Sequence, residues 1–168
     1  MKLHDLNAHL EADYDFNKDQ LKDIIAQYSA HQELFATANK LYRKKNVDKE
    51  AVKRYKRSLE ILDTEPLNAF AFLDPVRATV TARFAEVSRR NLKKCRAVLR
   101  QYEQIQAIYE GDYCKGKIEF DLERARNATN FAKRLHLLGN HSDALEQYQR
   151  AQNLYDGVYC KNKIALDL

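Results

Sequence analysis

The chain has 168 residues, 45% of them hydrophobic, and carries 10 Tyr and 7 Phe but only 4 Gly and 2 Pro. This length supports one ordinary domain, the scarcity of turn-forming residues excludes a many-stranded sheet, and the apolar content excludes a disordered chain. The formal charge of +5 comes from two basic segments, 40–57 and 89–100, whereas residues 1–39 are acidic. This composition predicts a mostly helical protein.

The first helices are marked by their capping residues. Asn17, with Gln20 three positions later, resembles a capping box and predicts the start of a long amphipathic helix over 18–45. Asp48 is the expected cap of a second helix that ends near Leu62.

An apolar connector separates this hairpin from the middle of the chain. Residues 64–74 read TEPLNAFAFLD, and we expect their large side chains to pack against helices. Asp74 followed by Pro75 predicts the next helix start. Residues 76–110 contain no Gly or Pro, so they form either one helix or two helices bent near 88–91.

The C-terminal part of the sequence predicts three further helices. The first spans about 113–138, and Gly139 marks the turn that follows it. Ser142 is the expected cap of a helix that runs to Asp156. A trailing helix covers 159–168.

The strongest signal in the sequence is an internal repeat. Residues 101–122 and 147–168 are identical at 12 of 22 positions without gaps, at a period of 46 residues. A weaker copy lies upstream, where Tyr55 corresponds to Tyr102 and Tyr148 on an apolar helical face. We expect all three tyrosines to pack between successive helices.

The last hairpin resembles the tetratricopeptide repeat. The residues that carry the resemblance are small or aromatic and fall at the family's spacing: Ala132, Gly139, Ala144, Tyr148 and Ala151. The first hairpin resembles it through a similar set: Phe35, Tyr42, Ala51, Tyr55 and Ile61. The period of 46–47 residues is longer than the family's period of about 34, which implies longer helices or connectors.

The resemblance implies an all-α fold of stacked antiparallel helical hairpins, a tetratricopeptide-like α-solenoid with a right-handed superhelical twist. About three hairpins, 18–63, 75–110 and 113–156, would form a single domain over 17–168 together with the trailing helix, after a lead segment over 1–16. Three interpretations fit the last helix: it is a short cap, the chain continues in a longer protein, or a second copy covers it.

Catalytic and metal-binding motifs are not found in the sequence. It has no Gly-rich phosphate loop, H-E-x-x-H or C-x-x-C pattern, so we expect neither enzyme activity nor a cofactor. His136 and His141 flank a turn and are expected to be surface residues rather than a metal pair. Cys114 and Cys160 occupy equivalent repeat positions and are expected to be small buried hydrophobes, although a nearby Lys could lower a thiol pKa.

The resemblance implies a protein–protein interaction module that holds a partner segment in the groove between stacked hairpins. The expected contacts are polar residues on the first helix of each hairpin: Lys40, Arg83, Arg126, Asn130 and Lys133. An odd number of cysteines and the lack of an N-terminal apolar segment favour a cytoplasmic, reduced protein with no membrane span.

Two other kinds of partner stay open. The basic segments predict a ridge that would bind nucleic acid or another polyanion, made of residues at matching repeat positions: Arg43, Lys49, Lys53, Arg90, Arg96 and Arg100. A homo-oligomer formed through the C-terminal helix is the other alternative.

Overall fold

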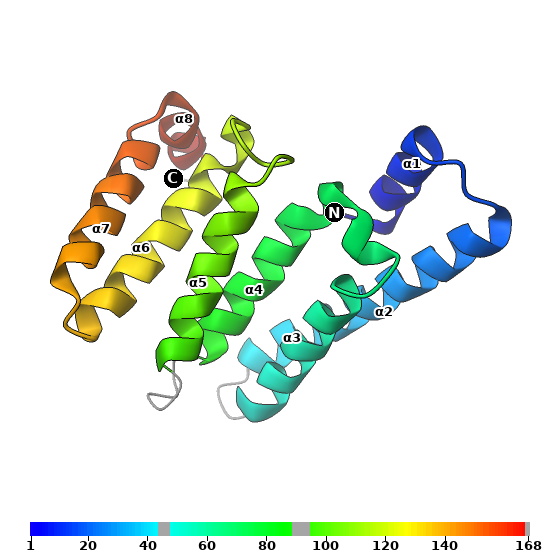
Figure 1. Cartoon of the computed structure of the whole chain (residues 1–168), viewed down its shortest axis with the longest axis horizontal. Helices are drawn as coiled ribbons and strands as arrows, with labels where there is room; N and C mark the ends of the chain where they lie inside the picture. The colour runs from blue at the N-terminus through cyan, green and yellow to red at the C-terminus, as the bar shows by residue number, and fades with distance from the viewer. Residues whose placement is uncertain (44–47, 89–94, 167–168) are drawn as a thin grey trace. The chain divides into compact units, whose positions relative to one another are not determined.

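In the computed structural model, residues 1–43, 48–88 and 95–166 are described, and they contain helices and turns but no β strand (Figure 1). The prediction of an all-α protein is confirmed. The chain divides into two compact bodies, an N-terminal body of Met1–Val87 and a C-terminal body of Ser88–Leu168. The assignment of one domain over 17–168 stays a prediction.

Helix α1, Leu3–Asp13, lies inside the predicted lead segment and belongs to the packed N-terminal body. Its Leu6 and Leu10 are fully buried, because a spacing of four residues places both on one helix face. The Tyr28 hydroxyl donates a hydrogen bond to the Met1 carbonyl at 3.1 Å, which ties the start of α1 to the next helix.

Helix α2, Lys18–Arg43, begins where the sequence predicted. The backbone N–H of Gln20 donates to Asn17 Oδ1 at 2.9 Å, and the backbone N–H of Asn17 donates to Gln20 Oε1 at 3.0 Å. This reciprocal pair is the capping box that the sequence predicted, and it satisfies amide groups that have no partner within the helix.

Helix α3, Asp48–Leu62, packs along α2 to form the hairpin core of this body. Tyr55 is fully buried and its hydroxyl donates to Asn39 Oδ1 at 2.7 Å. His31 Nδ1 lies 2.7 Å from the Ser58 hydroxyl, and both residues are buried. Burial lowers the pKa of His31 to about 4, so this imidazole is neutral at pH 7.

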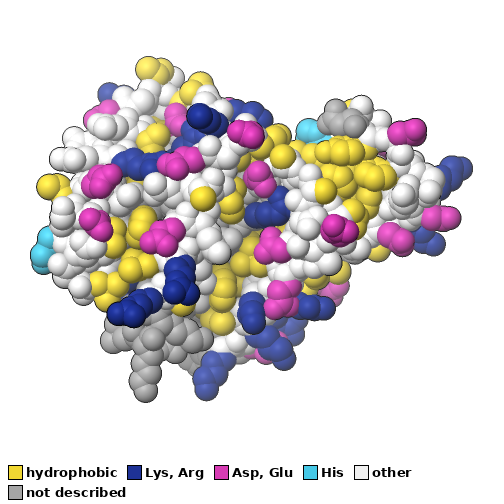
Figure 2. All heavy atoms as spheres, viewed as in Figure 1, with side chains coloured by type: hydrophobic (Ala, Val, Ile, Leu, Met, Phe, Trp, Pro, Cys, Tyr) yellow, Lys and Arg dark blue, Asp and Glu magenta, His cyan; other side chains and the backbone are white. Residues whose placement is uncertain are grey.

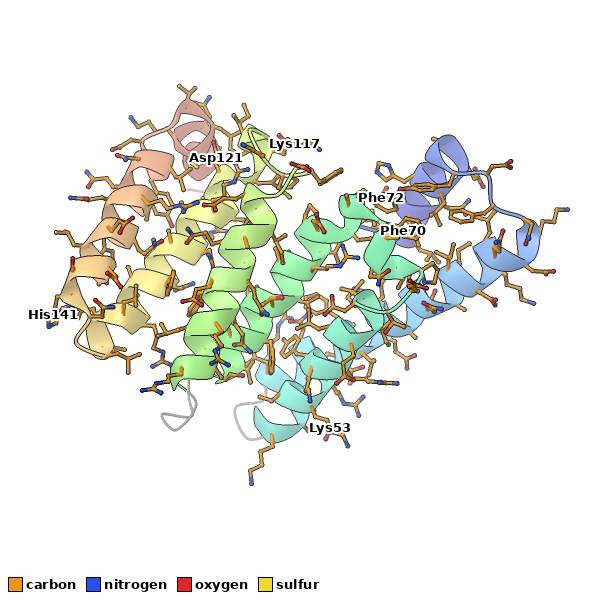
Figure 3. All side chains as sticks on the ribbon, in the orientation of Figure 1. Lys53, Phe70, Phe72, Lys117, Asp121 and His141 are labelled. Atoms are coloured by element: carbon orange, nitrogen blue, oxygen red, sulfur yellow. The ribbon has the colours of Figure 1, made fainter. Side chains whose placement is uncertain are left out.

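The connector after α3 forms two short 3₁₀ turns, η1 over Leu67–Ala69 and η2 over Ala71–Leu73, before α4, Asp74–Ser88. The prediction that its large side chains are packed is confirmed: Leu67, Phe70, Phe72 and Leu73 are buried. Phe70 and Phe72 stack at 5.4 Å, and the ring of Tyr14 lies 5.0 Å from Phe70, next to α1 (Figure 3).

The C-terminal body begins its described part with α5, Cys95–Glu110, which ends at Gly111 as expected. Residues 111–117 form turns, η4 covers Ile118–Phe120, and α6 spans Asp121–Leu137. The prediction of a helix from residue 113 was therefore wrong, because Gly116 has φ +74°, in the left-handed region that a right-handed helix does not use. Helices are described on both sides of 89–94, and whether 75–110 is continuous depends on residues outside the described part.

Helices α6 and α7, His141–Tyr155, form the second close hairpin, and α8 covers Val158–Leu166. Gly139 makes their turn at φ +81°, as the sequence indicated. The N-cap of α7 is Asn140, so the prediction of Ser142 was wrong by one half-turn. Helix α7 therefore begins two residues earlier than the sequence suggested.

The tyrosines at equivalent repeat positions differ in burial. Tyr55 is 0% exposed and Tyr102 is 4% exposed, which confirms the packing prediction for both. Tyr148 is 38% exposed, so the prediction was wrong for the third copy. Within the C-terminal body, the ring of Phe131 on α6 stacks on Tyr102 at 6.0 Å, and Tyr148 lies on the helix that follows α6.

Candidate binding surfaces

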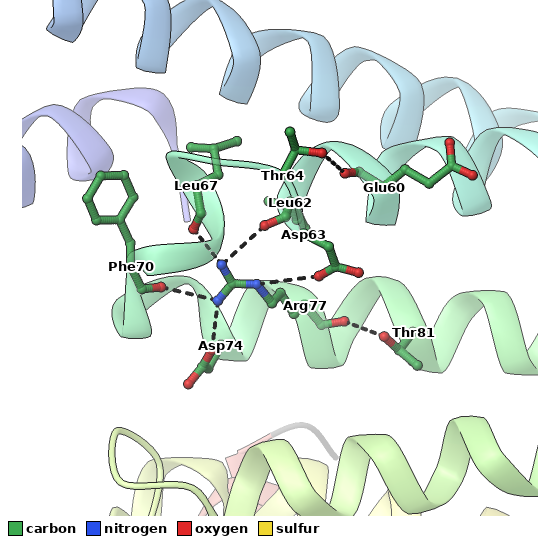
Figure 4. A network of polar contacts seen from close by, with 9 residues as sticks. All are labelled: Glu60, Leu62, Asp63, Thr64, Leu67, Phe70, Asp74, Arg77 and Thr81. Carbon is green, nitrogen blue, oxygen red and sulfur yellow. Dashed lines mark hydrogen bonds and ion pairs between the residues drawn. The ribbon is translucent and has the colours of Figure 1, made fainter.

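Arg77 holds the connector of the N-terminal body through a set of bonds that we call the first arginine clamp (Figure 4). Its guanidinium donates to three backbone carbonyls and one carboxylate: Leu62 O, Leu67 O, Phe70 O and Asp74 Oδ1. The side chain is only 10% exposed. The planar five-donor guanidinium suits this task, because it can satisfy several carbonyls at the end of a helix at once.

Arg124 forms the second arginine clamp in the C-terminal body with the same spacing. It donates to carbonyls at three matching positions and to one carboxylate: Tyr109 O, Cys114 O, Lys117 O and Asp121 Oδ1. Every donor and acceptor lies 47 residues after its counterpart in the first clamp. The repeat is therefore a repeat of structure, although the acceptor side chains differ.

Helix α6 has one exposed stripe between two packed faces. Eight of its side chains are buried, and the helix contacts both α5 and α7. Three predicted groove residues, Arg126, Asn130 and Lys133, are exposed and follow one another at i, i+4 and i+7, so they share one face. We call this surface the α6 stripe. The structure brings these three predicted residues together.

The other two predicted groove residues lie in the N-terminal body. Lys40 is exposed near the end of α2, and Arg83 is exposed on α4. The Arg83 guanidinium donates to Glu86 Oε2 at 2.9 Å, and Glu86 Oε1 accepts from the Tyr42 hydroxyl at 2.9 Å. The charge of Arg83 is thus partly neutralised. That Lys40 and Arg83 share a groove with the α6 stripe stays a prediction.

The predicted basic ridge is exposed wherever the structure describes it. Arg43, Lys49 and Lys53 are exposed in the N-terminal body, and Lys53 extends away from α3 (Figure 3). Arg96 and Arg100 are exposed on α5, one helical turn apart. Arg90 lies outside the described residues. Within each body the basic side chains can reach solvent, and one continuous ridge across both bodies stays a prediction.

Acidic side chains interrupt the positive charge around α3. Arg54 pairs with Glu50 at 3.0 Å, and Arg57 pairs with Glu60 at 3.0 Å. Lys and Arg side chains accordingly alternate with Asp and Glu over much of the visible surface (Figure 2). Only part of the basic excess of segment 40–57 is therefore available to a polyanion.

Large apolar side chains are exposed on α7 and at the end of α6. Leu145 is 58% exposed beside Tyr148, and Leu137 at the end of α6 is 72% exposed. The equivalent position on α5, Leu99, is only partly exposed. The apolar side chains on this face of α7 are thus more exposed to solvent than those at the equivalent positions of α5.

The two cysteines at equivalent repeat positions have buried thiols. Cys114 and Cys160 are both fully buried. Burial raises the pKa of the Cys160 thiol, and Lys117 Nζ lies 3.4 Å from the centroid of the Tyr113 ring. Among the described residues, no three His, Cys, Asp or Glu side chains group as metal ligands.

None of the described helices is both long and apolar enough to span a lipid bilayer. Comparison of the chain with models of protein families, with curated protein sequences and with solved structures finds no match.

Proposed function

We propose that this protein is a protein–protein interaction module, a tetratricopeptide-like stack of helical hairpins that holds an extended segment of a partner protein along the α6 stripe. The observation that carries the proposal is the surface of α6. Both flanks of this helix are buried against neighbours, and its remaining face presents Arg126, Asn130 and Lys133 to solvent. The two arginine clamps support a repeated hairpin architecture.

The chemistry of the α6 stripe favours an acidic, extended peptide. Arg126 and Lys133 supply positive charges seven residues apart, which is about 10 Å along a helix axis. A peptide in the extended polyproline II conformation rises about 3.1 Å per residue with three residues per turn, so acidic side chains three residues apart lie on one face and would match the two charges. The Asn130 amide lies between them and can both donate to and accept from a peptide backbone.

A library of extended peptides tests the proposal. Peptides retained by the wild-type protein should be enriched in Asp and Glu at a spacing of three residues, and a double charge reversal, Arg126→Glu with Lys133→Glu, should abolish their capture. Lys53→Glu with Arg100→Glu is the matched control, because it reverses two exposed charges elsewhere. Unchanged capture by the α6 variant, or no enrichment for acidic residues, would remove this assignment.

Binding of nucleic acid or another polyanion through the basic ridge is a second candidate. It is favoured by the exposed and closely spaced Arg96 and Arg100 on α5. Single-stranded DNA is a suitable probe, because the affinity of a polyanion reader falls steeply with salt, by a log–log slope that scales with the phosphates contacted. This function would be supported over the first if the affinity of the wild type for DNA falls steeply with salt and the variants Arg96→Glu and Arg100→Glu reduce that dependence.

A further inference from the structure

Two histidines face one another at the tip of the α6–α7 hairpin. His136 lies in the last turn of α6 and His141 is the first residue of α7 (Figure 3). Their Nδ1 atoms are 3.3 Å apart, and both side chains are exposed. The imidazole centroids are 4.9 Å apart at an interplanar angle of 63°.

These distances show which edges of the rings meet. The centroid separation of 4.9 Å exceeds the Nδ1 separation of 3.3 Å by 1.6 Å, so the nitrogen edges face one another. Two imidazole nitrogens bound to one tetrahedral metal ion, each at about 2.0–2.1 Å, lie about 3.3 Å apart. The pair therefore has the spacing of two ligands that share one ion.

The backbone between the histidines is fixed. The Gly139 amide donates to the His136 carbonyl at 3.0 Å, and the Asn140 amide donates to Leu135 O at 3.0 Å. Gly139 has the positive φ of +81° that this turn requires. A turn held in this way lowers the entropy cost of bringing two ligands to one ion.

We propose that His136 and His141 form a two-histidine chelate for a divalent transition-metal ion at the tip of this hairpin. Neutral imidazole suits Cu²⁺, Ni²⁺ and Zn²⁺, and affinity should rise towards Cu²⁺. Since the described residues offer no third side-chain ligand beside the pair, water completes the coordination shell and the ion exchanges readily. An ion bound here links the end of α6 to the start of α7.

Calorimetric titration of the full chain with CuCl₂ and with ZnCl₂ at pH 7.5 tests this site. The wild-type protein should bind one Cu²⁺ more tightly than Zn²⁺. His141→Gln should weaken Cu²⁺ binding at least tenfold. The matched control, His4→Gln with His9→Gln, removes two histidines from α1 and should leave the affinity unchanged.

A second readout separates a lost ligand from a damaged fold. Circular dichroism of His141→Gln should match the wild type, and Zn²⁺ should shift the imidazole NMR signals of His136 and His141 but not those of His4 or His9. Absence of saturable Cu²⁺ binding by the wild type would overturn the proposal. Equal binding by wild type and His141→Gln, or equal shifts at all the histidines, would overturn it as well.

Discussion

Two segments with similar sequences have different structures, and two with unrelated sequences share one. Residues 112–120 and 158–166 are identical at five of nine positions, yet the first forms turns and a 3₁₀ turn and the second forms helix α8. Residues 65–73 share none of nine identities with 112–120, yet η2 and η4 occupy equivalent positions. Tertiary bonds decide the conformation here, not the local sequence.

Each of the two connectors is held by an arginine clamp. Arg77 and Arg124 each lie ten residues after a carbonyl that they bind in their connector. Gly116, which supplies the left-handed turn, is replaced by Asn162 in α8.

The largest expected effect comes from removing a clamp. Arg77→Ala and Arg124→Ala should each lower the free energy of unfolding by about 3–5 kcal/mol, because several carbonyls and a carboxylate lose a buried charged donor. Arg124→Lys should recover little, since one ammonium cannot reach all the acceptors. Denaturant unfolding measures both.

Arg126→Ala is the control for the clamp variants, because this exposed side chain should contribute less than about 0.5 kcal/mol. If Arg124→Ala were as mild as Arg126→Ala, another set of contacts would hold the connector and the comparison of the segments would lose its explanation.

The tyrosines sharpen the comparison between covered and uncovered copies. Tyr102→Ala should cost about 3 kcal/mol, because it leaves a cavity beneath Phe131. Tyr148→Ala should cost less than about 1 kcal/mol, since this ring is already 38% exposed. The two free energies of unfolding can be measured side by side, and equal losses would show that Tyr148 is covered in solution.

Acid should affect the N-terminal body through His31. Its pKa is about 4 in the folded chain and about 6.5 when unfolded, so the unfolded state binds the proton first as the pH falls. This contribution is complete above pH 6.5 and is lost between pH 6.5 and pH 4, by about 3 kcal/mol in total.

A double variant, His31→Leu with Ser58→Ala, removes both members of that buried pair and should flatten the pH dependence of the unfolding free energy in this window. The second copy has Ile105 where the first has Ser58, so it lacks this pair. A wild-type stability that does not change from pH 6.5 to pH 4 would contradict this account.

The smallest expected effect on stability comes from substitutions at Gly116, in the turn before η4, and at Asn162, in helix α8. Gly116→Ala should cost about 1–2 kcal/mol, because alanine is strained at φ +74°. Asn162→Ala, at the equivalent exposed position in α8, should instead stabilise the chain by a few tenths of a kcal/mol through helix propensity. Paired thermal unfolding of the two variants would reveal opposite signs; matching signs would mean that the two segments have the same conformation.

Much of the fold could be predicted from the sequence wherever local chemistry determines it. The start of α2 followed from its capping residue Asn17, and the burial of Phe70 and Leu73 followed from the large apolar side chains of the connector. The three-residue α6 stripe could be predicted as well, because helical periodicity alone places Arg126 and Lys133 on one face.

Other features of the fold and of the candidate sites depend on tertiary contacts, which the identity of a side chain does not reveal. The acceptors of the arginine clamps are mostly backbone carbonyls, so only the shared pattern of Asp74 with Arg77 and Asp121 with Arg124 could have indicated them. The exposure of Tyr148 could not be predicted either, because a tyrosine is buried only when another helix covers it. The spacing of the His136 and His141 nitrogens required the geometry of the turn.

The clamp imposes a rule on length that is independent of composition. Because most of its acceptors are backbone carbonyls, one residue inserted or deleted between Leu62 and Arg77 would change the spacing from Arg77 to at least one acceptor. Most substitutions there would leave the acceptors in place. The spacing from the first copy to the second is 47 residues, and the spacing from the second copy to the third is 46. That difference falls between Arg124 and Ala144, outside the clamped interval, so it leaves the clamp bonds in place.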